Sequence, residues 1–172
     1  MTMPLLKNKS RTLFLVVIAL LTYGSQCHAE LKVGDTFPDL TAQKLEGELP
    51  AKLKGKIVFV DFWASWCVPC ASSFPVLDNL QKRYPDRLVI VAISVDEKPA
   101  KMQAFLKKHP VSFAVVRDAE HKLADLVDVQ AMPTSFLLDG EGKVRFMHSG
   151  FHAEESQKKY TEEIESLLKG TP

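Results

Sequence analysis

The sequence predicts one α/β domain, in which helices pack on a β-sheet. Residues 57–62 and 88–95 form short apolar runs rich in Val and Ile, which is typical of strands buried on both faces. Between them, residues 68–84 carry apolar side chains at helical spacing. A strand, a helix and a second strand in this order indicate a right-handed crossover between parallel strands.

The first 29 residues are expected to be an export signal. Basic residues precede an apolar run over residues 13–21, and Cys27-His28-Ala29 follows with small residues at its outer positions. This layout is typical of a secretory signal peptide that is cleaved after Ala29. A retained anchor is a weaker alternative, because the run is about half of the ~20 residues that a membrane-spanning helix needs. Acylation at Cys27 is another, which the poor lipoprotein match of Gly24-Ser25-Gln26 disfavours.

Residues 30–172 are then expected to be a single exported domain. The sequence has 22 Lys and Arg against 21 Asp and Glu, with no basic stripe, so nothing indicates nucleic-acid binding. Cys67 and Cys70 are the cysteines that remain after cleavage. A small disulfide-stapled scaffold would carry more cysteines at wider spacing, so the domain should rely on its hydrophobic core.

Helices and strands continue to alternate after residue 95. A helix is expected from Pro99, with Met102 and Phe105 on its apolar face. A strand over residues 112–116 and a short helix over residues 120–126 follow. Several basic residues on the outer face or next to helix ends are expected to be solvated: Lys98, Lys101, Lys107, Lys108, His109 and His121.

A hairpin and a helix complete the predicted domain. Residues 134–138 and 143–147 flank Asp139-Gly140-Glu141-Gly142, which is a hairpin signal. The closing helix, over residues 153–169, carries an apolar stripe that includes Tyr160.

Cys67 and Cys70 stand two residues apart at the turn between the first strand and its helix. The chain-entropy model credits so short a disulfide loop with roughly 2 kcal/mol, against about 3 for a fifteen-residue loop. Reversible redox chemistry is therefore a better reason than stability for the pair. A helix amino end favours a thiolate, so we expect Cys67 to be accessible with a lowered pKa and Cys70 to be more buried. Cys67 would then attack a disulfide, and Cys70 would resolve the mixed disulfide.

Other uses of the cysteine pair are less well supported. A zinc site needs further ligands, and His148 and His152 straddle Gly150 after a strand rather than lying on one helix face. Haem attachment needs a histidine after the second cysteine, where Ala71 stands. A purely structural disulfide is the remaining alternative.

The segment from Val60 to Cys70, Val-Asp-Phe-Trp-Ala-Ser-Trp-Cys-Val-Pro-Cys, closely resembles the active-site segment of thioredoxins. Pro75 stands five residues after Cys70, where thioredoxins also have a proline. Met132-Pro133-Thr134 resembles their cis-proline loop. The resemblance runs from about Val33 to Leu168 and implies a thioredoxin-like fold with a central mixed β-sheet flanked by helices.

Further features are similar to the exported TlpA/ResA-like branch of this superfamily. They are the signal, Gly34-Asp35-x-x-Pro38-Asp39, Gly55-Lys56 and an insertion between Val95 and Val116. This branch implies an N-terminal extension and a βα-type insertion after the second core strand. The insertion would contribute to the choice of partner.

The resemblance also implies roles for single residues. Cys67 would be the nucleophile and Cys70 the resolving cysteine of a redox disulfide around the dipeptide Val68-Pro69. Asp61 would accept or relay the proton of the resolving thiol, because burial raises the pKa of a carboxyl towards the range of a general base. An aspartate at the wet edge of the strand is the alternative.

Substrate binding is assigned by the same resemblance to a loop and a tryptophan. Pro133, if cis, would keep the loop open, so that the backbone at Met132, next to Thr134, could pair with an extended substrate. An ordinary trans proline is the alternative. Trp66 would shield the sulfurs and form part of the docking surface, whereas Trp63 is expected in the core.

The sequence departs from the family pattern at two places near the site. ResA-like proteins have a glutamate three residues after the second cysteine, and Ser73 stands there. The lysine that pairs with the thioredoxin aspartate has no counterpart in Val91-Ala92-Ile93. Proton transfer is therefore expected to differ, and the reduction potential stays open within the superfamily's range of roughly −270 to −120 mV.

Together these features predict an exported, periplasmic thiol–disulfide oxidoreductase that reduces protein disulfides, with cytochrome c maturation as one candidate pathway. An oxidising compartment would require a membrane thiol protein as electron donor. We expect a monomer with no bound metal and no cofactor beyond the redox disulfide. A disulfide-forming oxidant of the same fold is the main alternative. A Sco-type copper chaperone, whose cysteines have a three-residue spacer, and a peroxiredoxin-like peroxidase fit less well.

Overall fold

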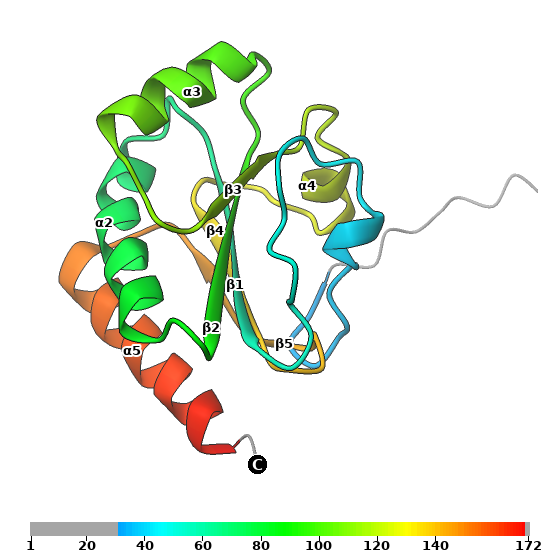
Figure 1. Ribbon diagram of the computed structural model, residues 1–172, viewed down its shortest axis with the longest axis vertical. Helices are drawn as coiled ribbons and strands as arrows, with labels where there is room; N and C mark the ends of the chain where they lie inside the picture. The colour runs from blue at the N-terminus through cyan, green and yellow to red at the C-terminus, as the bar shows by residue number, and fades with distance from the viewer. Residues whose placement is uncertain (1–30, 171–172) are drawn as a thin grey trace, which may run out of the picture.

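The computed structural model describes residues 31–170. The expected signal over residues 1–29, with cleavage after Ala29 or acylation at Cys27, lies outside the described residues. The centre of the domain is a five-stranded sheet in the order β3-β2-β1-β4-β5 (Figure 1). The sheet is mixed, as expected, because β1, β2 and β3 are parallel whereas β4 is antiparallel to both β1 and β5. The strands are β1 Ile57–Trp63, β2 Leu88–Ser94, β3 Ala114–Arg117, β4 Thr134–Leu138 and β5 Val144–Ser149.

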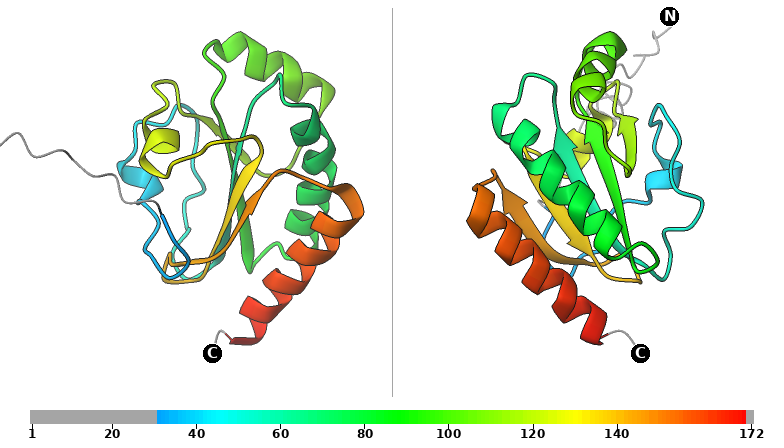
Figure 2. Two further views of the ribbon diagram at one scale, coloured as in Figure 1. Left: turned by 180° about the vertical axis from the view of Figure 1, so that it is seen from behind. Right: turned by 60° about the vertical axis from the view of Figure 1, so that its left-hand side comes forward.

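Helices cover both faces of this sheet. Helices α2 and α5 lie side by side over one face, and α4 and η1 lie on the other (Figures 1 and 2). None of the helices in the described range is long and apolar enough to cross a membrane. The helices are η1 Leu40–Ala42, which is a 3-10 turn, α2 Val68–Arg83, α3 Pro99–Lys108, α4 Lys122–Leu126 and α5 Ala153–Gly170.

The central strands and the hairpin follow the sequence pattern. Every residue of β1 and β2 is buried, because elements pack on both faces of these parallel strands. At the sheet edge, Val144 of β5 is buried and Arg145 is exposed. In the turn, the Asp139 carboxylate accepts the backbone N–H groups of Glu141 and Lys143 at 2.9 and 3.0 Å, which closes the predicted hairpin.

Several element boundaries differ from the prediction by one or two residues, and at two of them a side chain captures backbone groups. The strand expected from residue 112 begins at Ala114, since the N–H and the hydroxyl of Ser112 both donate to the Asp78 carboxylate at 2.7 Å. The helix expected from residue 120 begins at Lys122. There, Asp118 accepts two backbone N–H groups of the first turn, each at 2.9 Å.

The N-terminal extension, residues 31–56, contacts both edges of the sheet. Thr36 forms a β-bridge with Lys143 next to β5, and Glu46 forms one with Arg117 of β3. The second bridge has two backbone hydrogen bonds, of 2.9 and 2.8 Å. The buried Arg117 guanidinium also binds the Glu46 carboxylate at 2.6 and 3.0 Å. Phe37 is part of the hydrophobic core, so the extension is an integral part of the domain.

The insertion after β2 comprises α3 and β3, as the branch resemblance implied. Phe105 of α3 packs on Trp63 of β1 and Phe74 of α2, with ring centroids 4.8 and 5.2 Å apart. Trp63 is fully buried in this cluster, which confirms its expected place in the core. The aromatic contacts fix α3 beside the end of β1 and the first turns of α2.

Candidate active site at the amino end of helix α2

The junction of β1 and α2 places Cys67. Cys67 is the N-cap residue of α2, and its Sγ accepts the backbone N–H of Cys70 at 3.2 Å. Pro69 lies in the first turn, where the N–H groups have no partner within the helix and a missing N–H removes no helical bond. Unpaired N–H groups and the helix dipole favour negative charge at this position. The local structure therefore suits a thiolate at Cys67.

The loop before Cys67 is tied to the end of β2. The buried carboxylate of Asp96 accepts the Ser65 N–H at 2.9 Å and the Ser65 hydroxyl at 2.7 Å. The Ser94 hydroxyl also donates to Asp96, at 2.9 Å. Asp96 therefore positions the cysteine loop. Local sequence patterns did not identify it because it lies 31 residues beyond Ser65.

Cys67 and Cys70 form a disulfide with an S–S distance of 2.05 Å. Cys70 is fully buried and Cys67 is 5 % exposed, so the expected order of burial is confirmed. The expectation that Cys67 is accessible is wrong for this oxidised state, because the residue is buried and its sulfur is bonded to that of the buried Cys70. The pKa of the Cys67 thiol stays a prediction, since a disulfide sulfur carries no titratable proton.

Asp61 lies inside the sheet, so its placement at a wet strand edge is wrong. The residue is 1 % exposed and pairs across the strands with Ala92 of β2 and Ser135 of β4. The Ser135 hydroxyl donates to Asp61 Oδ1 at 2.7 Å. Asp61 Oδ2 has no hydrogen-bond partner among the described residues. Burial raises the pKa of Asp61 to about 7, and the Ser135 hydrogen bond opposes this rise.

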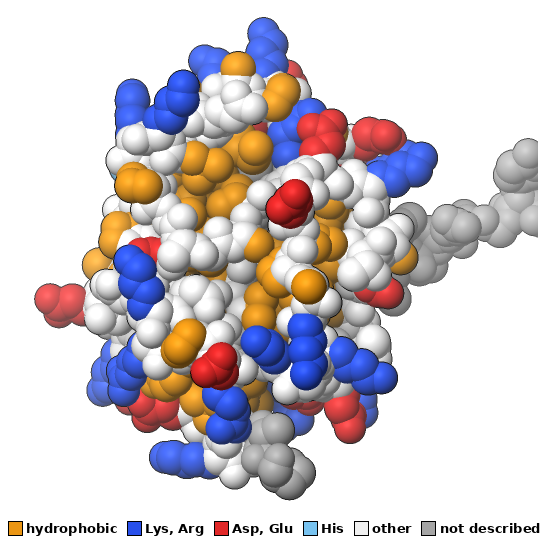
Figure 3. All heavy atoms as spheres, viewed as in Figure 1, with side chains coloured by type: hydrophobic (Ala, Val, Ile, Leu, Met, Phe, Trp, Pro, Cys, Tyr) orange, Lys and Arg blue, Asp and Glu red, His pale blue; other side chains and the backbone are white. Residues whose placement is uncertain are grey.

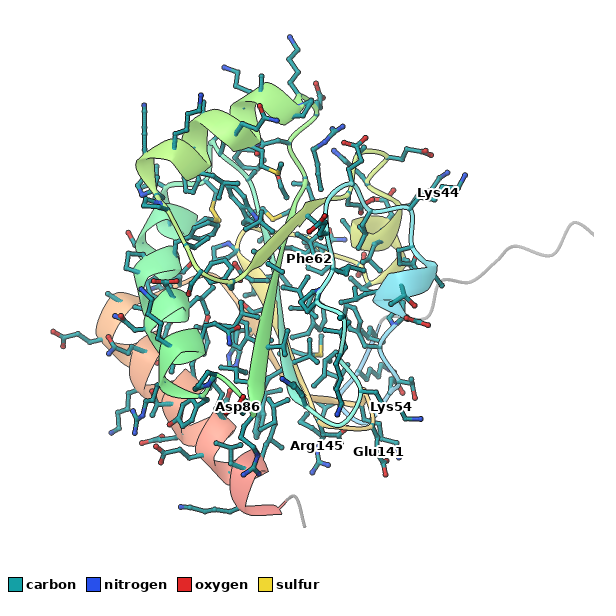
Figure 4. The ribbon with its side chains drawn as sticks, viewed as in Figure 1. Lys44, Lys54, Phe62, Asp86, Glu141 and Arg145 are labelled. Carbon is teal, nitrogen blue, oxygen red and sulfur yellow. A yellow bond between two sulfur atoms is a disulfide. The ribbon has the colours of Figure 1, made fainter. Side chains whose placement is uncertain are left out.

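The side chain of Asp61 faces the layer formed by α2 and α5. Residues alternate along a strand, so Asp61 shares a face with Phe59 and Trp63. Phe59 packs on Tyr160 of α5, and Trp63 packs on α2, with ring centroids 5.0 and 4.7 Å apart. Phe62, which is labelled in Figure 4, belongs to the opposite face and packs on Phe136 of β4. Asp61 therefore lies on the side of the sheet from which the cysteine helix starts.

Ser135 and Tyr160 extend the polar contacts of Asp61. Ser135 and Ser156 act on the Tyr160 hydroxyl as polar neighbours that lower its pKa. Burial, followed by the negative charge of Asp61, raises the pKa of Tyr160 to about 12. The sequence placed Tyr160 only in an apolar stripe. Its hydroxyl could have indicated a polar neighbour, because a buried tyrosine usually needs a hydrogen-bond partner.

His148 and His152 do not converge as metal ligands would. His148 Nε2 lies 2.7 Å from Glu163 Oε2 inside the domain, whereas His152 is exposed. Burial lowers the pKa of His148, and the neighbouring Glu163 opposes this effect. His148 is therefore part of a buried pair behind Tyr160, whose ring is 4.9 Å away.

The proposed substrate loop has the expected backbone. The Met132–Pro133 peptide bond is cis, so the ordinary trans proline is wrong. The Thr134 hydroxyl donates to the Ala131 carbonyl at 2.8 Å, and Pro133 accepts the Gly150 N–H at 2.8 Å. These bonds hold the loop at the start of β4, and its contact with a substrate stays a prediction.

The structure shows what stands in place of the family's glutamate and lysine near the site. Ser73 is buried, and its hydroxyl donates to the Cys70 carbonyl at 3.0 Å, so it bonds to the helix itself. Ala92 lies opposite Asp61 in the register, so β2 brings no lysine to the carboxyl. Ser135, from the strand on the other side, is the residue that hydrogen-bonds it.

Comparisons with known proteins agree with this geometry. A family described as thioredoxin-like matches residues 55–144. Thiol-disulfide oxidoreductase ResA of Bacillus cereus is 32% identical over 170 residues, which cover 91% of this chain and 98% of that protein. ResA of Bacillus subtilis is 43% identical over 93 residues, covering 54% of this chain and 52% of that one. A solved structure from Chlorobium tepidum, assigned as thiol:disulfide interchange protein DsbE, is 36% identical with a TM-score of 0.74, covering 81% of this chain and 99% of that chain. The chain therefore belongs to the thioredoxin superfamily and, within it, to the ResA-like thiol–disulfide oxidoreductases.

Proposed function

We propose that the protein reduces disulfide bonds of other proteins in an exported compartment. The observation that carries the proposal is the Cys67–Cys70 disulfide at the amino end of α2, in which Cys67 is the less deeply buried residue. The names of its relatives, thiol-disulfide oxidoreductase and thiol:disulfide interchange protein, support this chemistry.

In the proposed reaction, the Cys67 thiolate attacks one sulfur of a substrate disulfide. A mixed disulfide forms, and the other substrate sulfur leaves as a thiolate. The Cys70 thiolate then attacks the Cys67 sulfur, which restores the Cys67–Cys70 disulfide and releases the second substrate thiolate. Two electrons pass from the protein dithiol to the substrate, and the released thiolates take up protons.

Asp61 is proposed to accept the proton of Cys70 before the second step. A pKa of about 7 suits a general base near neutral pH. The unpartnered Oδ2 is the atom free to receive a proton, because Oδ1 already accepts the Ser135 hydroxyl.

Substrate contact is proposed for the loop Met132-Pro133-Thr134 and for Trp66, which is 68 % exposed. The loop backbone would pair with an extended segment of the substrate. Val68-Pro69, between the cysteines, would help to set the reduction potential. No cofactor beyond the disulfide is invoked.

Residues 1–29 are proposed to be a cleaved signal, so that residues 30–172 work as a soluble monomer in the periplasm. The support is the basic, apolar and small-residue order of that segment. A membrane thiol protein would supply electrons, because the compartment is oxidising. Disulfides of cytochrome c precursors are the substrate that the ResA-like branch suggests.

The reduction potential of the Cys67–Cys70 couple tests the direction of electron flow. Equilibration with glutathione or dithiothreitol should give a value below about −230 mV, towards that of thioredoxin. A value above about −150 mV, towards that of DsbA, would indicate an oxidant and exclude the cytochrome c role.

A further inference from the structure

A groove of about 460 Å³ opens beside Cys67, between the amino end of α2 and helix α3. Val68 and Ala71 of α2 and Phe105 of α3 supply apolar side chains to its lining. Cys67 borders the groove, whereas Cys70 does not. A partner that presents a sulfur to Cys67 therefore has its neighbouring residues within reach of this groove.

The charged side chains that line this groove are basic. Lys101 and Lys108 belong to α3, His109 follows them, and none of the described Asp or Glu residues lines the groove. Neither lysine takes part in an ion pair within residues 31–170. Figure 3 shows the gathering of Lys and Arg side chains over α3 at the top of the molecule. The sequence of α3 contains no acidic residue that could neutralise them.

Two large apolar side chains next to the groove are exposed. Trp66 is 68 % exposed and Val68 is 80 % exposed, although both flank the buried cysteine. Beyond Trp66 lies a second hollow, which Lys101 also lines and which includes Glu97 and the buried Asp96. The negative charge near the site is therefore on the far side of Trp66, and the groove beside Cys67 combines apolar surface with unpaired positive charge.

We propose that this groove binds the residues that flank the reacting cysteine of the partner protein, and that these residues are acidic. An apolar side chain of the partner would cover Phe105, and carboxylates would lie at Lys101 and Lys108. This proposal rests on the proposed function and adds the chemical class of the partner. Complementary charge would speed the encounter as well as select the partner.

Two disulfide-bonded peptides of equal length test the proposal. They differ only in the residues beside the cysteine, which are Asp in one and Lys in the other. Rates of reduction by the dithiol form of the full domain are measured by acid quench and chromatography. At low salt the acidic peptide should react at least about tenfold faster, which is the lower end of electrostatic steering effects. The ratio should fall towards one as added salt screens the charges.

Reversing the charge of the groove lysines tests whether they cause the difference between the two reduction rates. The double variant Lys101→Glu and Lys108→Glu should invert the ratio of the two rates. The double variant Lys52→Glu and Lys107→Glu is the matched control, because it changes the net charge by the same amount and neither lysine lines the groove. A control that shifts the ratio as much as the groove variant would assign the effect to overall charge and overturn the proposal.

A small neutral disulfide, hydroxyethyl disulfide, distinguishes failure of the groove proposal from failure of the proposed reductase function. If the protein reduces it but both peptides react at equal rates, the groove proposal is wrong and the reductase function stands. If the dithiol form fails to reduce any of the three disulfides, the proposed function and the groove proposal fall together.

Discussion

Replacing Ser135 with alanine should raise the pKa of Asp61. The Ser135 hydroxyl donates to Asp61 Oδ1 at 2.7 Å, and this bond opposes the effect of burial on the carboxyl. A hydrogen bond to a charged group is worth about 1.5–3 kcal/mol, and 1.36 kcal/mol corresponds to one pH unit, so the rise should be about one to two pH units. Because the wild-type value is about 7, Asp61 would stay protonated through neutral pH in the variant.

The measurement is a pH titration of the oxidised protein labelled with ¹³C at aspartate carboxyls. The Asp61 signal is identified by its loss in Asp61→Asn. Ser73→Ala is the matched control, because it also removes a buried serine hydroxyl, one that binds the Cys70 carbonyl rather than Asp61. Ser135→Thr keeps a hydroxyl and should restore most of the wild-type value. An Asp61 pKa that stays near 7 or falls in Ser135→Ala would refute the reasoning.

Other expected outcomes concern the cysteines and stability. Cys67→Ser should abolish reduction of insulin disulfides, and retained activity would exclude the dithiol mechanism. Cys70→Ser should trap substrates as mixed disulfides on Cys67, so repeated failure to isolate an adduct by non-reducing electrophoresis would contradict its resolving role. The pKa of Asp61 is about 7 in the folded state against 3.8 for an ordinary aspartate, so the folded state holds more protons between these pH values. The free energy of unfolding should therefore fall by up to about 1.4 kcal/mol per unit as pH rises from about 4 to 7, and this fall should disappear in Asp61→Asn. The free energy of unfolding is measured by urea unfolding at a series of pH values. If it changes equally with pH in the wild type and in Asp61→Asn, Asp61 ionises in the folded protein as it does in the unfolded chain.

The sequence was sufficient for features whose cause is local. The Val- and Ile-rich runs predicted β1 and β2 because strands buried on both faces need apolar residues throughout. The Cys67–Cys70 spacing and the motif around it indicated the disulfide at the amino end of α2. Resemblance, rather than pattern, supplied the cis bond before Pro133.

Features that depend on distant residues could not be predicted in this way. Ser135 is 74 residues from Asp61, and nothing in its local sequence marks it as the hydrogen-bond donor to that carboxyl. Tyr160 follows the apolar spacing of α5, which conceals the polar contact of its hydroxyl. The predicted start of β3 was wrong because Asp78 of helix α2 binds Ser112 and so holds it outside the strand.

The contacts of the N-terminal extension have a consequence for aggregation. A sheet edge exposes unpaired N–H and C=O groups that can pair with another chain. Here one segment occupies part of both edges, through Glu46 at β3 and through Thr36 at the start of β5. Loss of the extension would expose unpaired backbone groups at both edges of the sheet. The extension therefore shields part of each sheet edge from pairing with the edge of a second copy of the chain.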